Sequence, residues 1–140
     1  MVDPIVIDTS VFISGVLTRK GTSGLVLDHA YERCTVLFSE ATFEELERKL
    51  KHPKFSRVVS KETAQRILAL CTELGAWIEP ETVEAVSRDS EDDMFLAVAK
   101  AGDARQIVTL DKDLLVLNPW RGIELIKPYD FLVSVSSNLA

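Results

Sequence analysis

Acidic side chains occur in four separate segments of this 140-residue chain: two directly follow a run that is typical of a buried strand, and two lie in helical patterns between such runs. Asp8 directly follows the apolar run 5–7. The other three segments contain Glu44 and Glu45; Asp89, Glu91, Asp92 and Asp93; and Asp111 and Asp113. Carboxylates brought close together repel one another unless a cation lies between them. Oxygen ligands suit the hard ions Mg²⁺ and Mn²⁺, and a two-metal arrangement supports in-line attack of water on a phosphodiester.

These acids can act together only if the fold brings their segments to one place. Short apolar, β-branched runs alternate with helical patterns along the chain, which predicts an α/β fold with a parallel sheet. The predicted strands are 5–8, 35–39, 76–80, 106–110 and 123–126. We expect a single domain, residues 1–140, built as a three-layer α/β/α sandwich with helices on both faces of the central sheet. Ligands of such sheets bind beyond the carboxyl ends of the strands, where all four acidic segments fall.

Helical spacing of apolar residues predicts the elements between the strands. One helix follows the second strand and ends at 52–55, because proline disfavours helix in the residue before it. Another spans 61–74, with Gly75 expected as a left-handed cap residue. The remaining predictions are a helix capped by Thr22 or Ser23, a helix from about Met94 to Gly102, a short helix after Asp111, and a terminal helix opened by Pro128.

Each acid, taken alone, also fits a structural role as a turn or cap residue at a helix start. Two of the candidates have the three-residue spacing of a capping box. The candidates are Asp8 before Thr9, Thr42 with Glu45, Ser90 with Asp93, and Asp111. Capping does not explain why all four acidic segments fall at the same end of one sheet. We therefore prefer the metal site as the interpretation.

Helical periodicity separates neighbouring acids at one place only. Asp92 lies three, four and seven residues before apolar residues of the following helix, so it belongs to the inward stripe. Asp93 is rotated by about 100° from that stripe, which favours a cap or a supporting role. Glu44 and Glu45 are not separated by periodicity.

Composition limits the classes of protein that the chain can represent. Its 22 acids and 16 bases give a net charge of −6, which disfavours a generic nucleic-acid coat but not an enzyme that binds phosphate through metal ions. Cys34 and Cys71 are isolated, so we expect reduced core thiols and no zinc site. No apolar run approaches the roughly 18 residues of a membrane span, and the N-terminus lacks the basic flank of a secretory signal. We expect a cytoplasmic protein without a membrane association.

Four segments of the sequence resemble the PIN-domain ribonucleases, most closely the branch of VapC-like toxins from toxin–antitoxin systems. They are VIDTSVFISG, SEATFEELERKL, RDSEDDMFLAVAKAGDARQIVTLDKDLL and IELIKPYDFL. The similarity covers essentially the whole chain, and the order of the acidic segments matches. The resemblance implies Mg²⁺- or Mn²⁺-dependent cleavage of RNA, silencing by a cognate antitoxin protein, and a homodimer.

The resemblance also assigns roles to individual positions. The implied catalytic residues are Asp8, Glu45, Asp92 and Asp111. Asp8, Asp92 and Asp111 would be the metal ligands, with Glu45 as a ligand or as the anchor of a water. Supporting or alternative positions are Thr9, Ser10, Glu44, Asp93, Thr109 and Asp113. Ser10 stands where the family often has Asn, and Leu110 where it usually has Gly. Possible contacts to the RNA backbone are Arg19, Lys20 and Lys112.

Three other functions compete with the prediction of a metal-dependent endoribonuclease. A catalytically degenerate PIN-like module that binds RNA or protein without metal is the main alternative. A haloacid-dehalogenase-like phosphotransferase also places an Asp after its first strand, but it needs a second Asp where Ser10 stands. A receiver-type phosphoaspartate domain needs paired acids after the first strand, and Ile7–Asp8 provides no pair.

Overall fold

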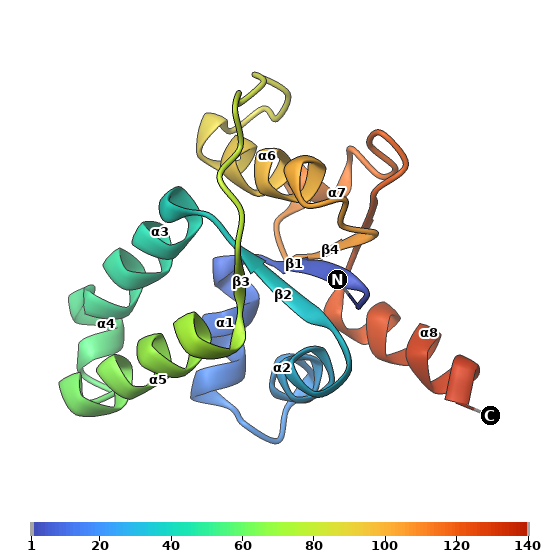
Figure 1. The fold of residues 1–140 in the computed structure, drawn as a ribbon. Coiled ribbons are helices and arrows are strands. Elements are labelled where there is room, and N and C mark those ends of the chain that lie inside the picture. Colours follow the sequence, from blue (N-terminus) through green and yellow to red (C-terminus); the bar gives the residue numbers. More distant parts are fainter. Residues whose placement is uncertain (1, 140) are drawn as a thin grey trace.

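A five-stranded parallel sheet lies at the centre of the computed structural model (Figure 1), which describes the backbone of residues 2–139 and the side chains of residues 2–136. The strand order is β3-β2-β1-β4-β5, and every neighbouring pair is parallel. The strands are β1 (Pro4–Ile7), β2 (Thr35–Phe38), β3 (Ala76–Trp77), β4 (Gln106–Val108) and β5 (Glu124–Ile126). Each lies within a predicted strand or extends it by one residue.

Helices cover both faces of the sheet, which confirms the predicted three-layer α/β/α architecture (Figure 1). The helix α6 (Asp93–Ala101) and the short α7 (Lys112–Leu115) lie on one face, preceded by the 3₁₀ turn η1 (Ser90–Asp92). The other face carries α1 (Thr9–Leu17), α2 (Thr22–Arg33), α3 (Glu40–Lys51), α4 (Pro53–Ser56), α5 (Lys61–Leu74) and α8 (Pro128–Leu139).

The two-residue period of the strands divides the core into two hydrophobic clusters. Val6, Leu37 and Ile107 point to the face of α6 and α7. Their neighbours along the strands, including Ile7 and Phe38, pack against the helices of the opposite face. Both faces of β1 and β2 are therefore buried, which explains why these strands are continuous apolar runs instead of alternating ones.

The order of the strands reverses at β1. The chain proceeds from β1 through β2 to β3 on one side, and then returns to place β4 and β5 on the other side of β1. The carboxyl ends of β1 and β4 therefore lie side by side at the switch point, which is where ligands of open α/β sheets bind. Asp8 follows β1, and Asp111 follows β4 after two residues.

Several expected helix boundaries are wrong in detail. The N-cap of α2 is Gly21, not Thr22 or Ser23. The capping box of α3 joins Ser39 to Thr42, which leaves Glu45 free of a capping role. Gly75 is extended, with φ −87° and ψ 170°, not left-handed. A Cβ there would lie 2.7 Å from the Phe38 ring, so close packing and not backbone freedom requires the glycine.

The predicted break after α3 is present, and the chain uses it to form another short helix. His52 is extended and Pro53 opens α4 at its first turn. Cys71 is buried in the larger hydrophobic cluster and Cys34 packs against it. Between residues 2 and 139, no helix combines the length and the apolar character that crossing a bilayer takes. The extent of the domain, residues 1–140, stays a prediction.

Candidate active site

Thr109 joins the two acids that lie at the switch point of the sheet. Its hydroxyl donates a hydrogen bond of 2.6 Å to Asp8 Oδ2 and accepts one of 2.9 Å from the backbone N–H of Asp111. Ser10 donates a second hydrogen bond of 3.1 Å to the same Asp8 oxygen. Asp8 is only 5 % exposed, and Thr109 is fully buried. The predicted supporting residues Thr109 and Ser10 thus contact Asp8 directly.

The structure separates Glu45 from Glu44, which periodicity left unresolved. Glu45 is 9 % exposed and accepts a hydrogen bond of 2.9 Å from the hydroxyl of Thr9. Arg48 lies 3.7 Å from its other carboxylate oxygen. Glu44 is exposed and does not line the cleft that contains Asp8. Of the two glutamates, Glu45 is therefore the one placed beside Asp8.

Asp92 and Asp93 are both buried, but they contact different parts of the structure. Asp92 faces the cleft and accepts a long hydrogen bond of 3.4 Å from the Ser87 hydroxyl. Asp93 accepts the backbone N–H groups of Val86 and Ser87 at 3.1 and 2.7 Å, so it fixes the preceding loop. The expected pairing of Ser90 with Asp93 as a cap is wrong, because Asp89 caps this turn instead.

A tight group of carboxylates extends the site beyond the predicted residues. One oxygen each from Asp89, Asp92 and Asp113 lies within 4.8 Å of the others. Asp111 caps α7 by accepting the N–H of Asp113 at 2.9 Å, as the capping interpretation expected, and still lines the cleft. Asp89 was not among the predicted site residues, although it belongs to the same acidic run.

The acids share a cleft of about 380 Å³ at the carboxyl ends of β1 and β4. Six carboxylates line it together with a single cation, Lys49. The lining acids are Asp8, Glu45, Asp89, Glu91, Asp92 and Asp111. Phe55 and Leu110 also line the cleft, and Leu110 is 47 % exposed. Leu110 is not among the described residues with positive φ, so a residue with a side chain fits where the resembled family usually has glycine.

Burial and mutual repulsion raise the pKa of three of these acids. Burial is the largest cause of the raised pKa of Asp8, and the nearby charge of Asp111 adds to it. Burial likewise raises the pKa of Glu45, with a further contribution from Asp8. For Asp92, burial, a hydrogen bond with Asp111 and the charges of its acidic neighbours raise the pKa to about 8. Excess negative potential of this kind favours a bound cation.

The donor set fits a hard divalent ion. All the ligating atoms available in the cleft are carboxylate or hydroxyl oxygens, which suit Mg²⁺ and Mn²⁺ better than zinc. Of the predicted metal ligands, Asp8, Asp92 and Asp111 all line the cleft, and Asp92 also belongs to the tight group with Asp89 and Asp113.

A known family matches most of this chain. The sequence profile of the PIN domain matches residues 4–113. The chain belongs to the PIN domain family. It is also 35 % identical over 115 residues to the uncharacterized protein MJ1680 of Methanocaldococcus jannaschii, a match that covers 81 % of this chain and 74 % of that protein.

Two solved structures share the fold of this PIN domain. One is VapBC2 from Rickettsia felis bound to a DNA fragment from its promoter, with a TM-score of 0.60 and 15 % identity over 89 % of this chain and 98 % of that one. The other is Mycobacterium tuberculosis VapC20, a toxin that cleaves the sarcin–ricin loop, with a TM-score of 0.58 and 16 % identity over 86 % of this chain and 98 % of that one. At these identities the likeness shows the fold alone.

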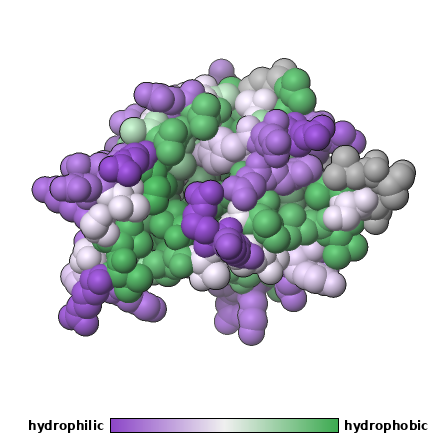
Figure 2. All heavy atoms as spheres, turned by 90° about the horizontal axis from the view of Figure 1, so that it is seen from below, coloured by the Kyte–Doolittle hydropathy of each residue, from purple (hydrophilic) through white to green (hydrophobic). Residues whose placement is uncertain are grey.

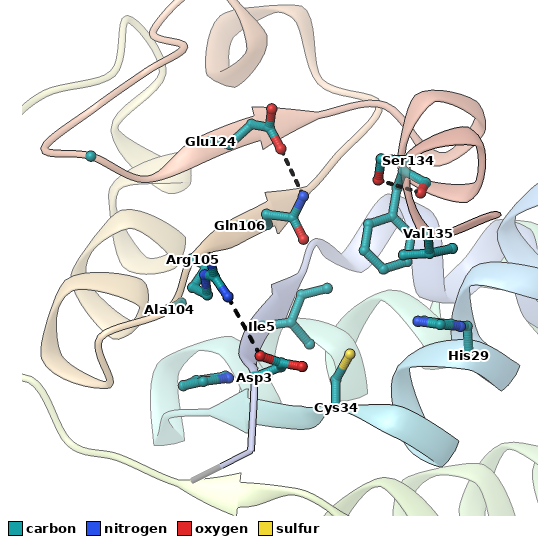
Figure 3. A pocket seen from close by; sticks show the side chains of 13 residues that line it. Asp3, Ile5, His29, Cys34, Ala104, Arg105, Gln106, Glu124, Ser134 and Val135 are labelled. Carbon is teal, nitrogen blue, oxygen red and sulfur yellow. Dashed lines mark hydrogen bonds and ion pairs between the residues drawn. The ribbon is translucent and has the colours of Figure 1, made fainter. Parts of the chain in front are cut away.

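A second cavity of the PIN domain lies at the opposite, amino-terminal edge of the same sheet (Figure 3). Its volume is about 490 Å³. Arg105 lies 3.7 Å from Asp3, and the Gln106 amide donates a hydrogen bond of 2.7 Å to Glu124. The two acids that line this cavity therefore both have a polar partner.

Six residues that line the cleft were not among the predicted site residues: Lys49, Phe55, Asp89, Glu91, Phe95 and Leu110. Lys49 follows Glu45 by one helical turn, so the pattern of α3 was enough to place it on the same face. Asp89 could have been found as the first acid of the run that ends at Asp93. No sequence pattern placed Phe55 in the cleft. It reaches the cleft from α4, whereas the proline at position 53 predicted only a break in the helix.

Proposed function

We propose that this PIN domain is a metal-dependent endoribonuclease and the toxin component of a toxin–antitoxin pair. The observation that supports the proposal best is the meeting of Asp8, Glu45, Asp92 and Asp111 in one cleft at the switch point of the sheet. A structural role as helix caps predicts neither this convergence nor the shared raised pKa of three of these acids.

In the proposed reaction, the residues of the chain hold a divalent ion and position water beside the phosphate. Asp8, Asp92 and Asp111 are the proposed ligands of Mg²⁺ or Mn²⁺, with Asp89 and Asp113 as further carboxylates beside Asp92. When bound, such an ion lowers the pKa of water and neutralises charge that develops on a phosphate. Thr109 and Ser10 fix the orientation of Asp8.

Glu45 is the proposed anchor and proton acceptor for the attacking water. Its Oε2 atom is held by the hydroxyl of Thr9. Burial raises the pKa of this carboxyl, and a higher pKa makes the carboxylate a better proton acceptor. Asp93 is the proposed support of the loop that carries Asp89, since it accepts two N–H groups of that loop. Glu44, which is exposed, has no role in the proposed reaction.

The direct test is cleavage of a mixed RNA pool by the purified protein. We expect cleavage with Mg²⁺ or Mn²⁺, none with EDTA, and none from Asp8→Ala under either condition. Full metal-dependent activity of Asp8→Ala would show that the proposed site is wrong. Circular dichroism of the variant checks that the fold is retained.

A melting experiment separates the enzyme from a degenerate binding module. A competent site should bind Mg²⁺ or Mn²⁺ and raise the melting temperature by mass action, because binding adds about 2.7 kcal/mol to the free energy of unfolding at a metal concentration of 100 times Kd. A chain that neither cleaves RNA nor gains stability from either ion would instead be the catalytically degenerate PIN-like module, binding RNA or protein without metal.

The proposal includes two protein partners and a compartment. Figure 2 shows hydrophobic surface on the face of α1, α2 and α5, where a hollow of about 570 Å³ is lined by apolar side chains that include Leu70 and Leu74. These leucines are 51 % and 62 % exposed, and we propose that an antitoxin segment covers them. We also propose a homodimer, for which sedimentation should give twice the chain mass of 15.6 kDa. The proposed location is the cytoplasm, where such a toxin meets RNA.

A further inference from the structure

The basic residues of this acidic protein are concentrated in one segment. Residues 48–61, defined here as the basic segment, contain six of the 16 lysines and arginines and none of the 22 acids. The segment therefore has a charge of +6, and the rest of the chain has −12, which together give the net −6. Clustering of cations on one stretch is the electrostatic footprint of a polyanion-binding surface.

The fold places the basic segment against the acidic cleft. It comprises the end of α3, the whole of α4 and the start of α5, which adjoin one another in Figure 1. Lys49 and Phe55 from this segment line the cleft together with Asp8 and Asp92. Lys49 and Phe55 therefore belong to the same surface as the carboxylates, and the other cations of the segment follow them along α3, α4 and the start of α5.

Most cations of the basic segment are available to a ligand. Arg48 and Lys51 each lie 3.7 Å from an acid of their own helix. Within the side chains described, the other four, Lys49, Lys54, Arg57 and Lys61, have no ion pair. Lys49 is half-buried in the cleft, whereas the other three are exposed. Arg19, a predicted RNA contact, instead pairs with Asp28 at 3.4 Å and lines the apolar hollow.

Hydrogen bonds fix the backbone of Phe55 in α4, and its ring packs at the edge of the cleft. The His52 carbonyl accepts the Phe55 N–H at 2.9 Å, and the Phe55 carbonyl accepts the Val59 N–H at 2.8 Å. His52 also caps α4 by accepting the Lys54 N–H at its Nδ1 atom. The Phe55 ring is half-buried against the core, and Lys54 Nζ lies 6.0 Å from its centroid. A fixed aromatic ring beside a cation is the arrangement that stacks an unpaired base.

We propose that the basic segment is the wall that binds single-stranded RNA, with Lys49 contacting the phosphate at the reacting position and Phe55 stacking a neighbouring base. This inference rests on the proposed function, because it names the substrate class of the same cleft. A base inside a duplex is not available to stack on Phe55, so the wall selects unpaired RNA. An acidic peptide would use the cations but would gain nothing from a flat ring, which favours nucleic acid as the ligand.

The test measures binding of a fluorescent single-stranded RNA by anisotropy, in an Asp8→Asn background that does not cleave it. Phe55→Leu keeps an apolar side chain against the core but removes the flat ring. We expect its Kd for the single strand to rise by about 5- to 100-fold, with the Kd for the same sequence as a duplex unchanged. Thermal melting checks that the fold is kept.

The charges are tested by a double variant with a matched control. Lys49→Gln with Lys54→Gln should reduce the slope of log K against log salt by about 1.4, since each phosphate contact to a single strand contributes about 0.7. Arg33→Gln with Arg105→Gln removes two exposed positive charges outside the basic segment and should leave the slope as it is. The result of this charge test can be interpreted even if Phe55→Leu does not fold.

The outcomes separate this inference from the proposed function. If the wild type cleaves RNA but Phe55→Leu and the Lys49→Gln, Lys54→Gln variant bind RNA as the wild type does, the proposed RNA-binding wall is wrong and the proposed nuclease activity stands. Weakened binding by both variants, in a protein whose wild type never cleaves, would support the wall and reject the nuclease. A loss of affinity for polyglutamate but not for RNA would overturn the wall in favour of an acidic protein partner.

Discussion

Acidic side chains lie at both ends of the central sheet, but their charges are balanced differently. At the amino-terminal edge, Asp3 pairs with Arg105, and Glu124 accepts a hydrogen bond from Gln106 (Figure 3). At the carboxyl-terminal edge, six carboxylates line a cleft of similar size with one lysine. Both cavities are lined by charged side chains, and the one at the amino-terminal edge is the larger, so neither size nor the presence of charges identifies the functional one.

The difference between the two ends lies in whether each acid is compensated. Paired acids stabilise the fold a little and need no ligand, because their charge is already balanced. Crowded and buried acids lower the stability of the fold unless a cation lies between them. Acids of this kind therefore indicate a site that binds a ligand. The comparison predicts that substitutions at the carboxyl-terminal edge change activity and those at the amino-terminal edge do not.

The largest expected effect comes from Asp92→Asn. We expect a loss of metal-dependent RNA cleavage of about 100-fold or more, since changes to residues that only support a metal ligand already cost about 10- to 100-fold. The measurement is initial cleavage rate at saturating Mg²⁺. Asp3→Asn, the matched change at the other end, should cleave at the wild-type rate. Equal losses in both variants would remove the functional distinction between the two ends.

A smaller effect is expected from Thr109→Val, which keeps the shape of a buried side chain but removes its hydroxyl. Asp8 then loses its hydrogen bond of 2.6 Å, and the N–H of Asp111 loses its acceptor. We expect about a 10- to 100-fold rise in the metal concentration needed for half-maximal cleavage. The matched control is Ser134→Ala, which removes a hydroxyl that donates to the Phe131 carbonyl at 2.7 Å at the other cavity. This control should leave the metal requirement unchanged. An unchanged metal requirement in Thr109→Val would show that Thr109 does not position the ligands.

The pH dependence of stability without metal should also distinguish the two ends. The pKa of Asp92 is raised from 3.8 to about 8, so the folded state retains a proton that the unfolded state releases. This contribution is fully present below about pH 4 and is lost as the pH rises towards 8. In EDTA, Asp92→Asn should therefore show a shallower fall of melting temperature between these pH values than the wild type. Asp3→Asn should retain the wild-type slope, and a wild-type slope in Asp92→Asn would contradict the raised pKa.

The smallest expected effect is that of Arg105→Ala. The side chains of Arg105 and Asp3 are 79 % and 62 % exposed, and exposed ion pairs contribute about 0–1 kcal/mol. Chemical denaturation should therefore give a free energy of unfolding within about 1 kcal/mol of the wild-type value, with unchanged cleavage. A large loss of stability would show that the amino-terminal edge is more than a set of balanced surface charges.

The sequence was sufficient for the layers of the fold and for the acids that meet in the cleft. Strand–helix alternation predicts a parallel sheet, and Asp8 and Asp111 each follow a strand of it. Periodicity also assigned Asp92 inward, because it precedes the apolar stripe of α6. Local spacing could not separate Glu44 from Glu45, since the decisive contact is the Thr9 hydroxyl from another helix.

Contacts that depend on packing between distant segments were out of reach of sequence reasoning. Gly75 has the residue type and position of a left-handed cap but is extended, and a glycine is needed there because the Phe38 ring leaves no room for a Cβ. The capping box of α3 uses Ser39 one turn earlier than the expected Thr42, and both residues suit the role chemically. Phe55 reaches the cleft only because α4 turns back after His52.

The position of β4 beside β1 determines when the cleft can form during synthesis on the ribosome. The hydrogen bond between Thr109 and Asp8 joins residues that are 101 positions apart. A ribosome must therefore synthesise β4 and the residues after it, and release Thr109 and Asp111 from its exit tunnel, before the cleft can close around its acids. No nascent chain that stops before Asp111 can assemble the complete cleft, so the strand order delays formation of the cleft until after β4 has been synthesised.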